Sequence, residues 1–114
     1  SSAASDVYKR QIDIKTKKRV FDGDGIFTSA ALKPAVMYNV YEAFDAVGIH
    51  VVSCGGVSSA ADALEMICAG AALVQLDEAV MKNPLACVEI TDALSDEMDK
   101  YGIAKVKDII GAAH

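Results

Sequence analysis

Apolar side chains recur at helical intervals in two stretches of the chain, residues 34–48 and 83–102. The apolar positions of the first stretch are Val36, Val40, Phe44 and Val47. Those of the second are Cys87, Ile90, Thr91, Leu94, Met98 and Tyr101. Each stretch begins next to a proline and closes on a glycine, which suit the first turn and the end of a helix. The pattern predicts two amphipathic helices.

Two short apolar runs, residues 49–53 and 71–76, predict buried strands. The first is rich in β-branched side chains, and the second has no polar residue before Gln75. Continuous apolar runs are typical of a parallel sheet that is covered on both faces. His50 falls in the first run and is therefore predicted to be a core histidine rather than a catalytic one.

Polar and small residues place the remaining elements. Ser59 and Asp62 have the spacing of a capping box, which predicts a helix that starts at Ser58 or Ser59 and stops near Gly70. A short helix is predicted over residues 106–110. Near the other end, the basic turn 15–18 lies between two apolar pairs and predicts an exposed hairpin. A loop follows it, marked by Gly23, Gly25, Thr28 and Ser29.

Strands that alternate with helices indicate an α/β fold with βαβ units. Two core strands are too few for a complete domain, because both sheet edges and one sheet face would be left uncovered. The chain is therefore predicted to be a slice of a larger domain.

Residues 1–11 differ in character from the rest. They show no apolar period, helix cap or turn signal, and they lack the apolar core of a signal peptide. Their back-translation over 33 nucleotides, 11 codons, looks like the adapter that transposase-based sequencing libraries attach to DNA. We expect residues 1–11 to be a non-native, adapter-derived segment and native sequence to run over residues 12–114.

Composition narrows the function classes. The chain has 114 residues, a formal net charge of −5 and a sequence pI near 4.8, which disfavours nucleic-acid binding. The longest apolar run, residues 67–76, is too short to span a membrane. The three cysteines lack metal-ligand spacing, so they are predicted to be small buried side chains in a reducing cytosol. Four methionines are predicted to fill the core, namely Met37, Met66, Met81 and Met98.

The strongest chemical signal is the turn Gly55-Gly56 between the first predicted strand and the capped helix. Glycines let a backbone approach a ligand closely, and a helix N-terminus offers N–H groups to an anion. In α/β barrels, the loops after strands 7 and 8 often bind phosphate in this way. A plain tight turn is the alternative explanation.

Several segments together resemble one family. They are Ile12-Asp13-Ile14-Lys15-Thr16, Leu32-Lys33-Pro34, Cys54-Gly55-Gly56-Val57, Asp62-Ala63-Leu64-Glu65, Ala69-Gly70-Ala71, Val74-Gln75, Asn83-Pro84-Leu85-Ala86-Cys87 and Tyr101 to Gly111. The family is the class 1 dihydroorotate dehydrogenases, and the closest type works with an electron-transfer partner subunit. The resemblance implies the C-terminal portion of a (β/α)8 TIM barrel, about strands 7–8 with their flanking helices, truncated at the N-terminus.

The resemblance also implies a cofactor, a substrate and partners. Such enzymes bind FMN and oxidise dihydroorotate to orotate in pyrimidine synthesis, in the cytoplasm and as homo-oligomers when full length. The family's catalytic base lies in an earlier barrel loop that this chain lacks, so no catalytic residue is expected here. The basic turn 15–18 is either a solvated loop or a docking point for an acidic partner subunit.

Five residues are implied to lie against FMN. Gly55 and Gly56 would donate backbone N–H groups to the phosphate, and Ser29 stands where the family usually has a glycine against the flavin. Asp77-Glu78 replaces a Gly-Thr pair that donates to the same phosphate. Either both acids point to solvent and favour the next helix, or their amides still face the phosphate and FMN is held more weakly.

Two rival functions stay open. A dihydropyrimidine dehydrogenase-type flavin barrel belongs to the same superfamily, but Asn83-Pro84-Leu85-Ala86-Cys87 and the ending Ile109-Ile110-Gly111 favour dihydroorotate. A non-catalytic barrel scaffold that has lost flavin binding would explain Asp77-Glu78 and Ser29. On either account the 114-residue chain is expected to be inactive and poorly folded by itself.

Overall fold

A computed structural model of the chain describes residues 12–19 and 29–114. The predictions for residues 1–11 and for the loop at Gly23, Gly25 and Thr28 lie outside these ranges. The predicted hairpin is confirmed: β1 (Ile12–Asp13) pairs with β2 (Lys18–Arg19) in antiparallel register. Asp13 closes the turn, because its Oδ1 accepts from the amide of Lys15 at 2.9 Å.

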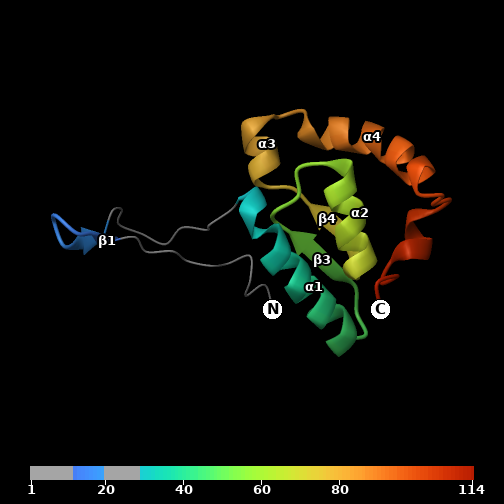
Figure 1. The fold of residues 1–114 in the computed structure, drawn as a ribbon, viewed down its shortest axis with the longest axis horizontal. Coiled ribbons are helices and arrows are strands. Elements are labelled where there is room, and N and C mark those ends of the chain that lie inside the picture. Colours follow the sequence, from blue (N-terminus) through green and yellow to red (C-terminus); the bar gives the residue numbers. More distant parts are fainter. Residues whose placement is uncertain (1–11, 20–28) are drawn as a thin grey trace.

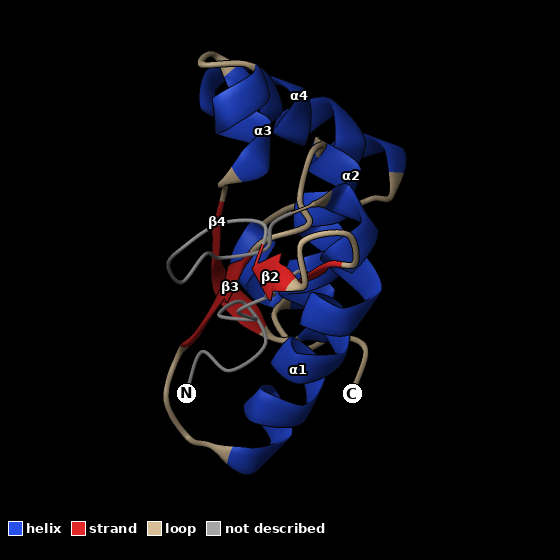
Figure 2. Ribbon diagram, turned by 90° about the vertical axis from the view of Figure 1, so that its left-hand side faces the viewer, coloured by secondary structure: helices blue, strands red, loops and turns tan. Residues whose placement is uncertain are grey.

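A parallel βαβ unit forms the centre of the fold. Strand β3 (Val51–Cys54) runs parallel to β4 (Ala71–Gln75), and α2 (Ala60–Ala69) connects them. Helix α1 (Lys33–Ala46) precedes β3 and is entered through a short 3-10 turn, η1 (Ala30–Leu32). Figure 2 shows α1 and α2 on the same side of the two strands. Between helices and strands lies the core, formed by Val36, Val40, Val57, Ala63, Met66, Ala69 and Ala71.

Both predicted ends of α2 are confirmed. Ser59 is the N-cap, and its Oγ accepts from the amide of Asp62 at 3.2 Å. Gly70 ends the helix with a φ of 131°. The last carbonyls of α2 are satisfied from far along the chain, by the amides of Gly111 and Ala113 and by the ring of His114. Helix α2 is therefore anchored at its C-terminal end by residues 111–114.

The strands are less covered than their sequence predicts. In β4, Leu73 is 67% exposed and alternates with half-buried neighbours, and in β3 Val52 is 50% exposed. The described residues cover only the face of the sheet that carries α1 and α2 (Figure 2), which agrees with the expectation that two strands alone leave one sheet face uncovered. The prediction that both strands are buried is wrong at Val52 and Leu73. The histidine prediction is also wrong: His50 precedes β3 and is exposed.

A helix absent from the sequence analysis follows β4. It is α3 (Glu78–Lys82), and it leads into the predicted long helix α4 (Ala86–Lys100). The chain ends with a 3-10 turn, η2 (Val106–Ile109), in place of the predicted short helix. Figure 1 shows α3 and α4 along one end of the molecule, beyond the end of β4.

Helix α4 does not close over β4. A cavity of about 520 Å³ lies between them, with a mainly apolar lining that includes Val74, Ile90 and Leu94. Two further predictions are wrong, because Met81 is 79% exposed and Cys87 is exposed. Among the described residues, no helix combines the length and apolar character needed to cross a bilayer. In the described part, α1 and α2 thus cover one side of the two-stranded sheet.

Candidate functional site

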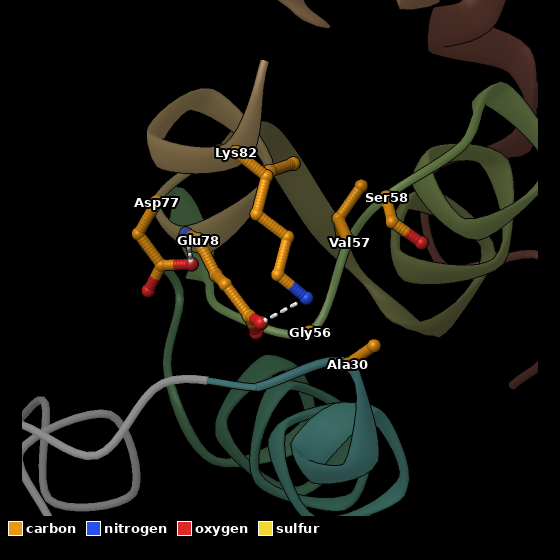
Figure 3. Close-up of a pocket in the computed structure, with 8 residues that line it drawn as sticks. Ala30, Gly56, Val57, Ser58, Asp77, Glu78 and Lys82 are labelled. Carbon is orange, nitrogen blue, oxygen red and sulfur yellow. Dashed lines mark hydrogen bonds and ion pairs between the residues drawn. The ribbon is translucent and has the colours of Figure 1, made fainter.

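A small pocket lies where the loops after β3 and β4 meet. Its volume is about 50 Å³, several times the roughly 10–15 Å³ that one water needs. Figure 3 shows the loop Gly56, Val57 and Ser58 on one side and Asp77, Glu78 and Lys82 on the other. Ala30 of η1 completes the lining below them. The carboxyl ends of adjacent parallel strands are the usual place for ligands in α/β folds.

The two glycines after β3 are required by the backbone. Gly55 and Gly56 have φ values of 103° and 78°, in a region that side-chain-bearing residues rarely adopt. A Cβ on Gly56 would lie 2.6 Å from the Cα of Lys33, so this loop contacts the start of α1 directly. Gly55 is buried and does not line the pocket, and a Cβ there would lie 3.7 Å from Oδ2 of Asp77. The glycines thus bring three segments, the loops after β3 and β4 and the start of α1, to one place.

The two acids after β4 start helix α3. Asp77 is the N-cap, and its Oδ1 accepts from the amide of Glu78. Glu78 pairs with Lys82 one turn later, with Oε1 2.7 Å from Nζ. Both acids are half-buried, and the Glu78 side chain is only 23% exposed. One of the two expectations was that both acids favour the next helix and point to solvent. They do start a helix, but they line the pocket rather than pointing to solvent.

A second charged cluster fixes the far side of the loop. Nζ of Lys33 lies 2.8 Å from Oδ1 of Asp62 and 3.3 Å from Oε2 of Glu65. The other carboxylate oxygen of Asp62 accepts from the amide and the hydroxyl of Ser58, each at 3.1 Å. Asp62 therefore connects the start of α1 to the last residue of the Gly55–Ser58 loop.

This cluster shifts two pKa values. The hydrogen bond to Asp62 raises the pKa of Lys33 above its ordinary 10.5, against partial burial and with help from Glu65. Burial raises the pKa of Asp62, but hydrogen bonds from Lys33 and Ser58 outweigh it and leave the pKa below its ordinary 3.8. Both groups are charged at neutral pH, and they hold the loop by charge-assisted hydrogen bonds.

Comparisons with known proteins decide the family. The family model described as dihydroorotate dehydrogenase matches residues 2–98. The chain belongs to the dihydroorotate dehydrogenase family. Two similar relatives are named dihydroorotate dehydrogenase B (NAD(+)), catalytic subunit: one from Brachyspira hyodysenteriae is 36% identical over 108 residues, and one from Pelobacter propionicus is 36% identical over 102 residues. These matches cover 91% and 89% of this chain but 35% and 34% of the relatives, so the chain spans about a third of their length.

A solved structure supports the fold. The dihydroorotate dehydrogenase of Eimeria tenella, solved in complex with ferulenol, superposes with a TM-score of 0.75 at 22% identity. The match covers 95% of this chain and 30% of that one. The predicted fold class is thereby confirmed: the parallel β3–β4 pair with its helices is a portion of a TIM barrel.

Dihydroorotate dehydrogenases are flavin-dependent enzymes, and the pocket residues fit the phosphate group of a flavin nucleotide. Gly56 gives close backbone approach and Lys82 brings a positive charge, whereas the hydroxyl of Ser58 already donates to Asp62. The carboxylates of Asp77 and Glu78 oppose an anion there, but each already has a partner in the chain, the amide of Glu78 and the ammonium of Lys82. In one respect the expectation changes, because the amide of Ser58 is engaged by Asp62 rather than left open for an anion.

Ser29 lies beside the pocket rather than in its lining. It is the N-cap of η1, and its Oγ accepts from the amide of Ala31 at 3.2 Å. Its neighbour Ala30 supplies the contact with the pocket. Ser29 is therefore connected to the pocket only by the turn that it caps.

Lys82 is the site residue that sequence reasoning missed. Its signal was present: Asp77 is a good N-cap, and Glu78 and Lys82 stand four residues apart in the order that stabilises a helix. Those features predict a helical turn that brings Lys82 back over Asp77-Glu78.

Across residues 12–19 and 29–114, no three His, Cys, Asp or Glu side chains are grouped as metal ligands would be.

Proposed function

We propose that residues 12–114 are the C-terminal third of an FMN-dependent dihydroorotate dehydrogenase catalytic subunit and carry strands 7 and 8 of its barrel. The observation that carries this proposal is the pocket at the ends of β3 and β4, with Gly56 on one side and Lys82 on the other. In α/β barrels the loops after strands 7 and 8 commonly bind a phosphate. Family membership supplies the flavin as the phosphate-bearing ligand.

In this proposal the chain binds the phosphate end of FMN and performs no chemical step. The backbone amides of Gly55, Gly56 and Asp77 face the phosphate, whereas the amide of Glu78 is engaged by Oδ1 of Asp77. Ser29 positions η1 against the flavin. FMN held by these residues would supply a hydride acceptor for dihydroorotate, and a base elsewhere in the barrel would take the proton from the neighbouring carbon. Holding the phosphate fixes the cofactor so that its ring meets the substrate in one orientation.

The uncovered surfaces of the fold agree with a longer subunit. The exposed face with Val52 and Leu73 and the apolar cavity beside α4 would be covered by the remaining strands and helices of the barrel.

We further propose dihydroorotate as the substrate, a cytoplasmic location and a homo-oligomer when full length. The relatives' name, a catalytic subunit, supports a second, electron-transfer subunit. Residues 1–11 are proposed to be adapter-derived.

The test uses a hybrid subunit, in which residues 12–114 replace the matching third of the Brachyspira hyodysenteriae catalytic subunit. We expect the hybrid subunit to purify with bound FMN, visible as a flavin absorbance band, and to convert dihydroorotate to orotate. The unaltered Brachyspira subunit is the control. A hybrid subunit that is folded by circular dichroism but colourless would overturn the proposal. Turnover of dihydropyrimidines instead of dihydroorotate would favour the rival flavin barrel.

A second candidate, a barrel scaffold that has lost flavin binding, is favoured by one observation: two half-buried carboxylates line the pocket. Two unit charges about 4 Å apart interact by roughly 4 kcal/mol at an effective dielectric of 20. We propose that Asp77-Glu78 weakens FMN retention without abolishing it. Replacing the pair, Asp77→Gly with Glu78→Thr, should then tighten FMN binding in the hybrid subunit. An unchanged affinity would contradict this explanation.

A further inference from the structure

The pocket contains one cation whose role the family resemblance does not explain. Lys82 extends from the last turn of α3 across the mouth of the pocket, and Figure 3 shows its ammonium group above Gly56. Its partner is the carboxylate of Glu78, 2.7 Å away. The other lysine near the loop, Lys33, is held on the far side by Asp62 and Glu65.

The partner of Lys82 is easily exchanged. The Lys82 side chain is 75% exposed, and ion pairs this close to water contribute little because solvent competes for both charges. A phosphate dianion carries more charge than a carboxylate and accepts shorter, stronger hydrogen bonds from an ammonium group. An anion that enters beside Gly56 can therefore take the ammonium group from Glu78.

Charge balance in the pocket requires such a cation. Among the described residues that line it, Asp77 and Glu78 are acidic and Lys82 is basic. If Lys82 stayed on Glu78 alone, a phosphate brought to this place would face the carboxylate of Asp77 with no cation of its own. The position of Lys82 supplies the compensation that the pair Asp77-Glu78 makes necessary.

We propose that Lys82 is the cationic ligand of a phosphate monoester in this pocket and that Glu78 is its internal counter-ion, released when the phosphate binds. The inference rests on the proposed function, in which that monoester is the phosphate of FMN. In this proposal Lys82 exchanges the carboxylate of Glu78 for the phosphate. Asp77, Glu78 and Lys82 then take the place of the neutral Gly-Thr pair typical of the family.

The test compares FMN with riboflavin, which has the same ring but no phosphate, in the hybrid subunit. Lys82→Gln should weaken FMN binding about tenfold to a hundredfold, the loss expected for one charged hydrogen bond. Riboflavin affinity should change less than about twofold, within the range of surface substitutions. Added inorganic phosphate should compete with FMN in the parent hybrid subunit and much less in the variant. Lys82→Arg should keep the preference for FMN because it keeps the charge.

Lys100→Gln is the matched control. Lys100 pairs with Glu97 at 3.2 Å on α4, and Glu97 is 23% exposed, the same fraction as Glu78. This variant removes a comparable helix ion pair away from the pocket, so both flavin affinities should stay unchanged. Glu78→Gln should tighten FMN binding about twofold to fivefold, because it removes a competing surface charge.

Three results separate the possible failures. If Lys82→Gln leaves the preference for FMN over riboflavin unchanged while the hybrid subunit still retains FMN, the role of Lys82 is overturned and the proposed function stands. If Lys82→Gln and Glu78→Gln only lower the melting temperature, like Lys100→Gln, the pair merely stabilises α3 and the inference is again overturned. A folded parent hybrid subunit without flavin overturns the proposed function itself.

Discussion

Both the backbone conformation and the close contact with Lys33 require a glycine at position 56. A Cβ at Gly56 would meet main-chain atoms of Lys33, with Cα at 2.6 Å and N at 2.7 Å. Main-chain atoms cannot rotate away, so either the loop after β3 or the start of α1 has to move. Overpacking of this kind costs about 1–3 kcal/mol. The φ of 78° adds about 1–2 kcal/mol for a residue with a side chain. Gly56→Ala should therefore lower the free energy of unfolding by about 2–5 kcal/mol.

Two other glycines separate these contributions. Gly102 has a φ of 68°, but nothing lies within 4 Å of a Cβ built there, so Gly102→Ala should show the backbone cost alone. Gly48 has open space and no left-handed φ, so Gly48→Ala should be neutral or should stabilise by about 0.4–1 kcal/mol. The measurement is urea unfolding of the three variants in the hybrid subunit, with the slope checked for constancy.

The reasoning fails if Gly56→Ala and Gly102→Ala lose the same free energy, because the contact with Lys33 would then impose no steric constraint. Flavin retention gives an independent check. Gly56→Ala displaces either the loop, which lines the pocket, or the start of α1 and with it the preceding η1, whose Ala30 lines the pocket. It should therefore release FMN faster. Gly102 lies beyond the end of α4, so Gly102→Ala should leave FMN retention unchanged.

Three further predictions concern stability. The folded-state pKa of Asp62 is lowered, so its stabilising contribution is complete above pH 3.8 and disappears as the pH falls through the lowered value. Asp62→Asn should therefore make the unfolding midpoint depend less on pH in the acid range. A profile parallel to that of the parent would contradict this. Met66 is fully buried, so Met66→Ala should cost about 2–5 kcal/mol, whereas Met81→Ala, at a side chain 79% exposed, should cost less than about 0.5 kcal/mol; equal losses in urea unfolding would refute the burial pattern. Ser59→Ala removes the N-cap of α2 and should cost about 0.5–2 kcal/mol, with Ser59→Asp as the variant that should restore most of it.

The sequence was most informative where local chemistry determines structure. The cap at Ser59 and the glycine end at Gly70 follow from hydrogen bonds to residues three or four positions away, and both were predicted correctly. The glycines after β3 were likewise correctly identified as the end of a strand and the start of a loop beside a helix. Such features depend on residues close in sequence, so they can be predicted from the sequence pattern.

Other features depend on what lies across the fold. Leu73 lies in an apolar run but is exposed, because the described residues cover only one face of β3 and β4. His50 is exposed because it lies in the loop before β3 rather than in the strand. Met81 reads as core material from its neighbours, yet α3 directs it outward. To predict that Lys82 lines the pocket, one has to know that a single helical turn brings its ammonium group over the loop after β3. A turn of five residues is too short for hydrophobic periodicity to reveal.

The anchoring of α2 also has a consequence for synthesis of the protein. Its first two turns pair with Lys33 through Asp62 and Glu65, but its last carbonyls accept from Gly111, Ala113 and His114. A ribosome makes the first partner long before α2 and the last partners long after it. The helix that supports the Gly55–Ser58 loop therefore has both ends satisfied only once residues 111–114 have emerged. Nascent chains that stop before Gly111 should carry α2 with a frayed end, open to proteases that the finished fold resists.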